Sequence, residues 1–413
     1  MEYIIELGKK AKSAQNSLAC ASTALKNKAL TTIAYALKEH KEAIIEANAV
    51  DLKNGKENGM SDSLLDRLAL SESRINDIAD SVLEIVALPD PVGVVKNGST
   101  RPNGLNIEKV AVPMGTIAVI YEARPNVTID AAALCLKSGN AVILRGGKEA
   151  INSNIATANI MRDAIESVGL DRNCIQLVED TSRETANALM KLNGYIDVLI
   201  PRGGAGLINS VVQNATVPVI ETGVGNCHIF VDKTADIDMA VEIIFNAKTS
   251  RPSVCNAAES LVIHKDIAAK ALPAIKAKLD EKNVELCGDE YAASIIDINL
   301  ATEEDWGKEY LDYKMSIKTV ENIDEAVTHI NIYSTGHSEA IITSDYSSAQ
   351  KFTQLVNSSA VYVNASTRFT DGGQFGFGAE IGISTQKLHA RGPIGLPELT
   401  TTKFIIRGNG QTR

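Results

Sequence analysis

The fold is decided by residues 115–147, GTIAVIYEARPNVTIDAAALCLKSGNAVILRGG. This stretch holds two short apolar runs, Ile117–Tyr121 and Ala141–Leu144, each of a length that suits a strand buried on both faces. Further runs of the same kind follow along the chain at Cys174–Val178, Asp197–Ile200 and Val217–Ile220. Helical patterns lie between these runs, notably at 152–168 and 183–192. Strands that alternate with helices predict a parallel, doubly wound sheet.

A second α/β series follows and predicts a second lobe of the same class. Its helices are expected at 236–249, 266–280, 323–331 and 345–356, and its strands at 260–264, 316–320, 340–343 and 361–363. Ahead of both series, residues 1–90 show helical patterns. One of these patterns spans Thr31–Asn48, and another begins after Ser71, whose hydroxyl suits an N-cap. The predicted fold class is therefore α/β, with two doubly wound lobes.

The size and composition of the chain limit its function. A chain of 413 residues is too long for one ordinary core, so two or more lobes are expected. Hydrophobic residues make up 45% and charged residues 22%, which is typical of globular proteins. The net charge of −10 argues against a general nucleic-acid or anionic-membrane surface. No apolar run approaches the roughly 20 residues that span a bilayer.

The cysteines and histidines argue against a metal site. The six cysteines are scattered without a C-x-x-C pair, and the six histidines are dispersed as well. Neither a disulfide framework nor a zinc site is therefore expected. Residues 1–30 are amphipathic and lack the apolar centre of a secretory signal. We expect a protein of the reducing cytoplasm, where a reactive thiol stays usable.

Two segments do not follow the α/β series. Around Gly98 and Gly104 the chain has turn residues, and an alternating apolar and polar run follows at 105–110. This pattern predicts a hairpin within residues 94–112 rather than a strand of a buried sheet. A last strand is expected at Lys403–Arg407. No other predicted strand lies near it in the sequence, so we expect it to pair with another subunit.

One cysteine lies in a polar loop, RPSVCNAAE, at residues 251–259. The loop separates a predicted helix from a predicted strand, and Arg251 comes four residues before Cys255. A nearby cation lowers the pKa of a thiol and so favours the reactive thiolate. Most cysteines are instead small buried hydrophobic residues, but a polar, proline-bent loop argues against that alternative. Cys255 is therefore the candidate nucleophile.

Two loops after predicted strands are candidate phosphate sites. Arg145 ends the strand at 141–144, and a guanidinium there can hold a phosphate through two hydrogen bonds. Gly203 and Gly204 follow the strand at 197–200 and open a helical pattern, where backbone amides can approach a phosphate. The alternatives are a solvated turn at Arg145 and a plain strand-to-helix turn at the glycines. The full G-x-G-x-x-G fingerprint is absent from the sequence.

Other polar residues also follow predicted strands. Asn126 could donate a hydrogen bond to a developing oxyanion, although Pro-Asn pairs also simply favour turns. Glu221 suits a base, a cofactor ligand or a helix cap. Four arginines are candidates to bind anionic groups of a substrate, and a solvated surface position is the alternative for each. These are Arg124, Arg251, Arg368 and Arg391.

Taken together, these strings resemble one known family. The chain is similar to the gamma-glutamyl phosphate reductases, also called glutamate-5-semialdehyde dehydrogenases, which belong to the aldehyde dehydrogenase superfamily. The resemblance extends from the N-terminal helices to the last strand. It is carried by Pro113–Thr128, Lys137–Gly147, Ile200–Gly204, Gly225–His228, Asn246–Lys248, Arg251–Ala257, Val363–Phe369 and Gly378–Thr385.

This resemblance implies an aldehyde dehydrogenase-like fold in three parts. A cofactor-binding domain would comprise residues 1–97 and 113–225, and a catalytic domain residues 226–392. A small β element for oligomerisation would comprise residues 98–112 and 398–413. The resemblance therefore also implies a homo-oligomer, and it is compatible with a functional association with glutamate 5-kinase.

The resemblance also implies roles for individual residues. The nucleophile of the superfamily corresponds to Cys255, and its glutamate-glycine motif begins at Glu221. A lysine that contacts the adenosine ribose in relatives corresponds to Arg145, which suits the 2′-phosphate of NADP. The glutamate that holds the nicotinamide ribose corresponds to Glu309, and the oxyanion asparagine to Asn126.

The implied activity is the NADPH-dependent reduction of L-glutamyl 5-phosphate to L-glutamate 5-semialdehyde in proline synthesis. The Cys255 thiolate would attack the acyl phosphate, and the resulting thioester would accept a hydride. Because phosphate rather than water is the acyl acceptor in reverse, Glu221 is less needed as a water-activating base. The nearest alternative is an aldehyde dehydrogenase that hydrolyses its thioester. More distant alternatives are a silent cofactor-binding protein and a cysteine acyltransferase.

Overall fold

The computed structural model describes residues 2–413, apart from the side chain of Ser63. The chain divides into two compact units. Unit 1 comprises Met1–Thr222, Gly376–Gly382 and Ile394–Arg413, and unit 2 comprises Gly223–Phe375 and Ile383–Pro393. The main boundary between the units therefore falls inside the motif Glu221-Thr222-Gly223.

Unit 1 begins with five helices. They are α1 (Glu2–Leu18), α2 (Thr23–Glu39), α3 (Lys41–Glu57), α4 (Asp62–Leu68) and α5 (Glu72–Ala87). The Ser71 hydroxyl accepts a hydrogen bond from the Arg74 amide at 3.2 Å, which confirms the predicted N-cap. The single helix predicted over Thr31–Asn48 is wrong. The chain leaves helical geometry at His40 (φ −101°, ψ 24°), which ends α2 and precedes α3.

A four-stranded parallel sheet forms the centre of unit 1. Its strands are β3 (Thr116–Tyr121), β4 (Ala141–Arg145), β5 (Ile175–Leu177) and β6 (Val198–Arg202), in the order β5-β4-β3-β6. The connecting helices are α6 (Asn126–Lys137), η1 (Lys148–Ala150), α7 (Ile151–Ser167), η2 (Arg172–Cys174), α8 (Arg183–Met190) and α9 (Ala205–Asn214). All six residues of β3 are buried, as expected for a strand covered on both faces. The predicted parallel sheet is confirmed.

The strand predicted at Val217–Ile220 is wrong. Only an isolated bridge forms there, between Leu199 and Val219. Pro218 lies within this segment and has no N–H to donate to a ladder, although its carbonyl accepts from the Leu199 amide at 2.9 Å. The segment therefore touches β6 without becoming a further strand.

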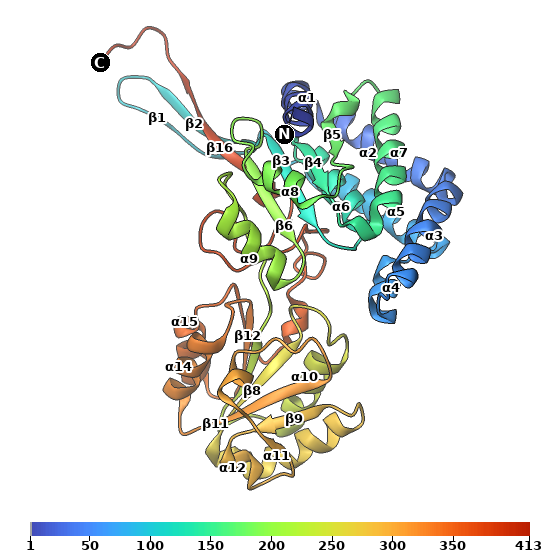
Figure 1. Cartoon of the computed structure of the whole chain (residues 1–413). Coiled ribbons are helices and arrows are strands. Elements are labelled where there is room, and N and C mark those ends of the chain that lie inside the picture. The colour runs from blue at the N-terminus through green and yellow to red at the C-terminus, as the bar shows by residue number, and fades with distance from the viewer. Residues whose placement is uncertain (1) are drawn as a thin grey trace. The chain divides into compact units, whose positions relative to one another are not determined.

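A three-stranded antiparallel sheet extends from unit 1 (Figure 1). The predicted hairpin is confirmed as β1 (Val95–Thr100) and β2 (Asn106–Pro113). The expectation that the last strand lacks a partner in its own chain is wrong, because β16 (Thr400–Arg407) pairs with β2 along its whole length. The pairing joins residues about 300 positions apart, as in Arg407 opposite Asn106, so local sequence patterns could not reveal it.

Unit 2 contains a seven-stranded parallel sheet, which confirms a second α/β lobe. Its order is β10-β9-β11-β8-β7-β12-β13. The strands are β7 (Cys227–Val231), β8 (Ala258–His264), β9 (Glu285–Gly288), β10 (Asn299–Leu300), β11 (Lys314–Val320), β12 (Ser338–Ile342) and β13 (Ala360–Val363). The sequence patterns had indicated β8, β11, β12 and β13 but not the other three.

Helices cover both faces of this second sheet (Figure 1). On one face α10 (Ile237–Thr249) and α11 (Lys265–Asp280) share an apolar cluster with the sheet, and on the other α14 (Ile323–Tyr333) and α15 (Tyr346–Leu355) share another. Alternate residues of one strand serve opposite faces, as in Ile229 and Phe230. The remaining elements are α12 (Glu290–Ala293), α13 (Glu303–Trp306), η3 (Thr367–Phe369), β14 (Ile383–Ser384), β15 (Gly392–Pro393) and η4 (Pro397–Leu399).

The described residues contain neither a membrane-spanning helix nor a candidate metal cluster. No helix within residues 2–413 combines the length and the apolar character that crossing a bilayer requires. Within the same residues, no group of three or more His, Cys, Asp or Glu side chains lies suitably for a metal ion.

Candidate active site

The cysteine loop lies between a helix and a buried strand of unit 2. The Asp236 side chain caps α10 by accepting from the Met239 amide at 2.9 Å. The helix ends at Thr249, and β8 begins at Ala258, so both ends of the loop are fixed. Cys255 lies between them and is partly exposed. A thiol in such a position can meet a substrate.

Four other cysteines are buried and unsuited to attack a substrate. They are Cys135, Cys174, Cys227 and Cys287. Burial raises the pKa of Cys174 to about 12, and burial beside Glu339 raises the pKa of Cys227 well above its usual value. These thiols therefore stay protonated near neutral pH. Cys20 is exposed but lies in the turn after α1 of unit 1, outside the loop at 251–259.

The backbone of Cys255 rests directly on the segment Gly225–Cys227. A Cβ atom added to Gly225 would lie 1.5 Å from the Cys255 carbonyl oxygen, so only glycine fits at this position. The Cys227 thiol donates a weak hydrogen bond to the same carbonyl oxygen across 3.2 Å. These two contacts hold the backbone of Cys255 against the segment Gly225–Cys227.

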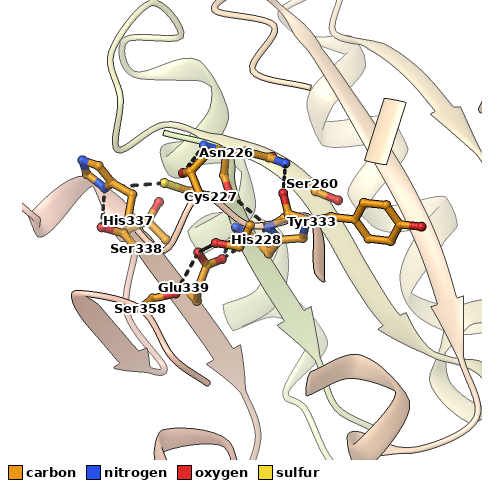
Figure 2. A network of polar contacts seen from close by, with 12 residues as sticks. Asn226, Cys227, His228, Ser260, Tyr333, His337, Ser338, Glu339 and Ser358 are labelled. Atoms are coloured by element: carbon orange, nitrogen blue, oxygen red, sulfur yellow. Dashed lines mark hydrogen bonds and ion pairs between the residues drawn. The ribbon is translucent and has the colours of Figure 1, made fainter. Parts of the chain in front are cut away.

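The supporting segment is itself held by buried polar contacts (Figure 2). Asn226 donates through its side-chain amide to the carbonyls of Trp306 and Tyr333, each at 3.0 Å. The Glu339 carboxylate, fully buried, accepts from the His228 amide at 2.6 Å. Hydrogen bonds to buried polar groups are costly to break, so the segment that supports Cys255 is held rigidly.

Glu309, predicted to hold the nicotinamide ribose, lies beside the same segment. Its Oε1 accepts a hydrogen bond from the Gly225 amide at 2.7 Å. Burial raises the pKa of Glu309 above its usual value, while this hydrogen bond and His337 oppose the shift. The structure therefore places Glu309 beside the segment that supports Cys255. Its predicted contact with the nicotinamide ribose stays a prediction.

A buried ion pair joins the helix before the cysteine loop to the strand after it. Lys248 of α10 and Glu259 of β8 are both fully buried, and their charged atoms lie 2.7 Å apart. Glu259 also accepts from the Leu311 amide at 3.2 Å, which ties the Glu309 segment to the loop. Burial raises the pKa of Glu259 to about 7, although Lys248 opposes this shift. Burial lowers the pKa of Lys248.

This pair makes stability depend on pH. Because the pKa of Glu259 is higher in the folded chain than in the unfolded chain, its contribution to stability is present at low pH and is lost as pH rises toward about 7. We expect Glu259→Gln to be less stable overall, since Lys248 loses its partner. Between about pH 5 and about pH 7, however, its stability relative to the native chain should rise by about 2 kcal/mol. Urea unfolding across this range measures the difference, and parallel curves would contradict it.

Two of the four predicted arginines gather near Cys255. Burial lowers the pKa of Arg368, the charge of Arg251 lowers it further, and Cys255 raises it. The three groups are therefore within electrostatic reach of one another. Arg391 donates instead to the Asn357 carbonyl at 3.0 Å, in the same unit. Arg124 belongs to unit 1, where its amide donates to the Glu122 carbonyl at 2.7 Å.

The predicted glycine site lies at a switch point of the unit 1 sheet. β3 has β4 on one side and β6 on the other, and ligands of open α/β sheets bind where the strand order reverses in this way. Gly203 and Gly204 follow β6 there and precede α9. The Gly204 amide donates to the Glu122 carboxylate at 3.0 Å. The Glu122 carboxylate therefore occupies the amide at the start of the helix, where a phosphate could otherwise bind.

Arg145 ends β4 in the same sheet. Its Nη2 donates to the carbonyls of Thr181 and Ser182 at 2.6 and 3.2 Å. Its buried Nε has no hydrogen-bond partner within residues 2–413. Burial lowers the pKa of Arg145, and nearby Glu149 opposes this shift. The guanidinium is therefore fixed in place while keeping a donor that the protein leaves unused.

Asn126 and Glu221 also lie in unit 1. Asn126 begins α6, and its Nδ2 donates to the Asp130 carboxylate at 3.0 Å. Burial raises the pKa of Asp130 to about 6. Glu221 precedes Thr222, whose hydroxyl donates to the Pro201 carbonyl of β6 at 2.8 Å. Both predicted residues thus lie near the carboxyl ends of the central strands. The oxyanion role of Asn126 and the role of Glu221 stay predictions.

Sequence reasoning missed several residues of this region. Glu122, Lys248, Asn256 and Glu259 all have polar contacts that shape the two loops. A faint signal existed for the ion pair, because Lys248 ends an apolar helix and Glu259 opens an apolar strand. Charged residues at such positions are almost never buried without a partner. The partners themselves emerge only from the fold.

Comparison with known proteins supports this fold. The aldehyde dehydrogenase family model matches residues 2–293 of the chain. A crystal structure of gamma-glutamyl phosphate reductase from Thermotoga maritima superimposes with a TM-score of 0.98 at 50% identity, covering 99% of each chain. The fold and the cysteine loop thus define a protein of the aldehyde dehydrogenase class.

Curated relatives narrow the class. Gamma-glutamyl phosphate reductase of Clostridium perfringens is 60% identical over 413 residues, which is 100% of this chain and 99% of the relative. The protein of that name from Heliobacterium modesticaldum is 59% identical, covering 98% of each chain. The chain belongs to the aldehyde dehydrogenase family and, within it, to the gamma-glutamyl phosphate reductases.

Proposed function

We propose that the chain reduces L-glutamyl 5-phosphate to L-glutamate 5-semialdehyde, with NADPH as the reductant and release of phosphate, in L-proline biosynthesis. The observation that carries this proposal is its 60% identity, over the whole chain, to a protein named for this reductase activity. The partly exposed Cys255, in a loop fixed at both ends, supplies the nucleophile that such chemistry needs.

In the first step the Cys255 thiolate attacks the acyl carbon of the substrate. The carbon–oxygen bond to the phosphate then breaks, phosphate leaves with the electron pair, and a thioester on Cys255 remains. A bound nicotinamide cofactor supplies the hydride that reduces the thioester carbon. The Cys255 sulfur then leaves as a thiolate when the adduct collapses, and the aldehyde is released. Division into two displacements replaces one difficult step by two easier ones.

Charge on the substrate has to be held while these bonds change. Backbone amides of the Cys255 loop and the Asn126 side chain are the proposed donors to the developing oxyanion, each worth about 3 kcal/mol when well placed. The Asn126 amide would have to exchange Asp130 for the substrate to do so. Arg251 and Arg368 are proposed to bind the substrate anions beside Cys255, and Arg124 and Arg391 remain candidates for the same task.

Five residues are proposed to bind the cofactor. Gly203 and Gly204 would bind the pyrophosphate through backbone amides, with Glu122 displaced from the Gly204 amide. Arg145 would bind the 2′-phosphate that distinguishes NADP from NAD, because a guanidinium can hold a phosphate through two hydrogen bonds. Glu309 would hold the nicotinamide ribose, and Glu221 would order the cofactor rather than activate water.

The assembly and location of the protein are also proposals. The sheet of β1, β2 and β16 has outer edges without a strand partner in residues 2–413, and an open edge can pair with a second copy. Phe404 and Ile406 on β16 are exposed apolar residues that such a contact would cover. We propose a cytoplasmic homo-oligomer, with a functional association with glutamate 5-kinase.

The reaction is tested in reverse, with L-glutamate 5-semialdehyde, NADP⁺ and varied phosphate. We expect NADPH formation to depend on phosphate and to fall at least about 10²-fold in its absence, since phosphate is the acyl acceptor. Turnover that is unaffected by phosphate would instead indicate the hydrolytic aldehyde dehydrogenase. Titration with NADPH and NADH in parallel checks the cofactor, and we expect the tighter binding for NADPH.

A further inference from the structure

The residue that follows Cys255 uses its whole side chain to hold another segment. Asn256 is 5% exposed. Its Nδ2 donates to the carbonyls of Arg368 at 3.2 Å and Thr370 at 2.9 Å. Its Oδ1 accepts from the Arg368 guanidinium, and its backbone carbonyl accepts from the Thr367 hydroxyl at 2.7 Å. One asparagine thus binds both the backbone and the cationic group of Arg368.

The other end of the cysteine loop holds the same guanidinium. Arg368 Nε donates to the Ser250 hydroxyl at 3.0 Å. The guanidinium therefore bridges Ser250 and Asn256, the residues on either side of the 251–255 stretch. Five donors in a rigid plane allow an arginine to make both contacts at once, which a lysine could not do. The bridge fixes a positive charge along the loop that carries Cys255.

This charge acts on the sulfur. Cys255 raises the pKa of Arg368, against the lowering by burial and by Arg251. The attraction is reciprocal, so a fixed Arg368 cation stabilises the Cys255 thiolate by the same interaction. The effect depends on where the guanidinium lies, because the interaction weakens with distance.

We propose that Asn256 is a positioning residue that holds the Arg368 guanidinium along the Cys255 loop and thereby stabilises the Cys255 thiolate. Asn256 acts on Cys255 through Arg368. The inference rests on the proposed function only in taking Cys255 to be the nucleophile. The ionisation of Cys255 can be measured without any substrate.

The test is a double-mutant cycle of Asn256→Ala and Arg368→Met, with the thiol pKa as the readout. The rate at which iodoacetamide alkylates the Cys255-containing peptide is followed by mass spectrometry as a function of pH. We expect each single variant to raise the apparent pKa of Cys255 by about one unit. The double variant should shift it no further than Arg368→Met alone, because Asn256 acts through that cation.

Controls separate positioning from general loosening of the fold. Asn331→Ala removes a comparable amide, which donates to the Leu355 carbonyl and accepts from the Asn357 amide, each at 3.0 Å. We expect this variant to leave the pKa of Cys255 unchanged even if it lowers the unfolding midpoint.

Two results would overturn the proposal. One is a Cys255 pKa that does not change in Asn256→Ala. The other is a double variant whose shift equals the sum of the two single shifts, because Asn256 would then act independently of Arg368. Failure of the proposed function has a different signature, namely a Cys255→Ser enzyme that keeps its turnover whatever the thiol pKa is.

Discussion

A Cys255→Ser variant is expected to lose turnover by about 10³-fold or more, while NADPH still binds. A serine hydroxyl is far less acidic than a thiol, so the nearby arginines cannot convert it into a useful nucleophile. The contacts that hold the loop involve the backbone and Asn256, and neither changes in this variant. Absorbance of NADPH, with semialdehyde, NADP⁺ and phosphate as reactants, measures the loss.

Cys20→Ser is the matched control for this prediction. Cys20 is exposed in unit 1, so the same exchange of sulfur for oxygen there should leave turnover unchanged. NADPH titration by fluorescence shows whether the Cys255→Ser chain remains folded and able to bind. Turnover at the native level in Cys255→Ser would exclude Cys255 as the nucleophile.

The second large effect is expected from Gly225→Ala. The new Cβ would lie 1.5 Å from the Cys255 carbonyl oxygen and 2.3 Å from its carbonyl carbon, so the loop has to move. A displacement of about 1 Å at reacting groups costs about 10²-fold in rate. Forcing a methyl group into a packed site also costs about 1–3 kcal/mol of stability. Steady-state kinetics and urea unfolding measure both consequences.

Gly307→Ala is the control for this collision. Gly307 also lies in unit 2, but the nearest atom to its added Cβ is Cδ1 of Tyr333 at 3.9 Å, an ordinary contact. We expect its turnover to stay within a factor of about two of the native value, since nothing near Cys255 moves. Native turnover in Gly225→Ala would mean that the loop position is not critical.

The strands with a local signal were predictable from the sequence. β3 and β4 each contain a short continuous apolar run, and the strand length of these runs and their flanking turn residues identify them. Val217–Ile220 has the same appearance, but Pro218 keeps it from forming a ladder. Local patterns could not predict the pairing of β16 with β2, because it depends on a contact between distant segments, and only the family resemblance had grouped these segments in one β element.

The residues of the candidate site also differ in whether the sequence could predict them. Cys255 could be identified from its polar loop and from its resemblance to a known family. Arg368 was a candidate anion-binding residue, but the proximity of Arg368 and Gly225 to Cys255 could not be predicted, because both come from distant positions in the chain. Gly225 approaches from the start of β7, and Arg368 from the 3₁₀ turn after β13. Their importance follows from contacts that exist only after the sheet of unit 2 has formed.

The central claim is that Cys255 carries the acyl group. Its most direct test is the mass of the Cys255-containing peptide after incubation of the protein with L-glutamate 5-semialdehyde and NADP⁺ without phosphate. We expect a glutamyl group on that peptide, labile to hydroxylamine and removed when phosphate is added. An unmodified peptide from a preparation that turns over normally once phosphate is supplied, with the acyl group on another residue, would contradict the claim.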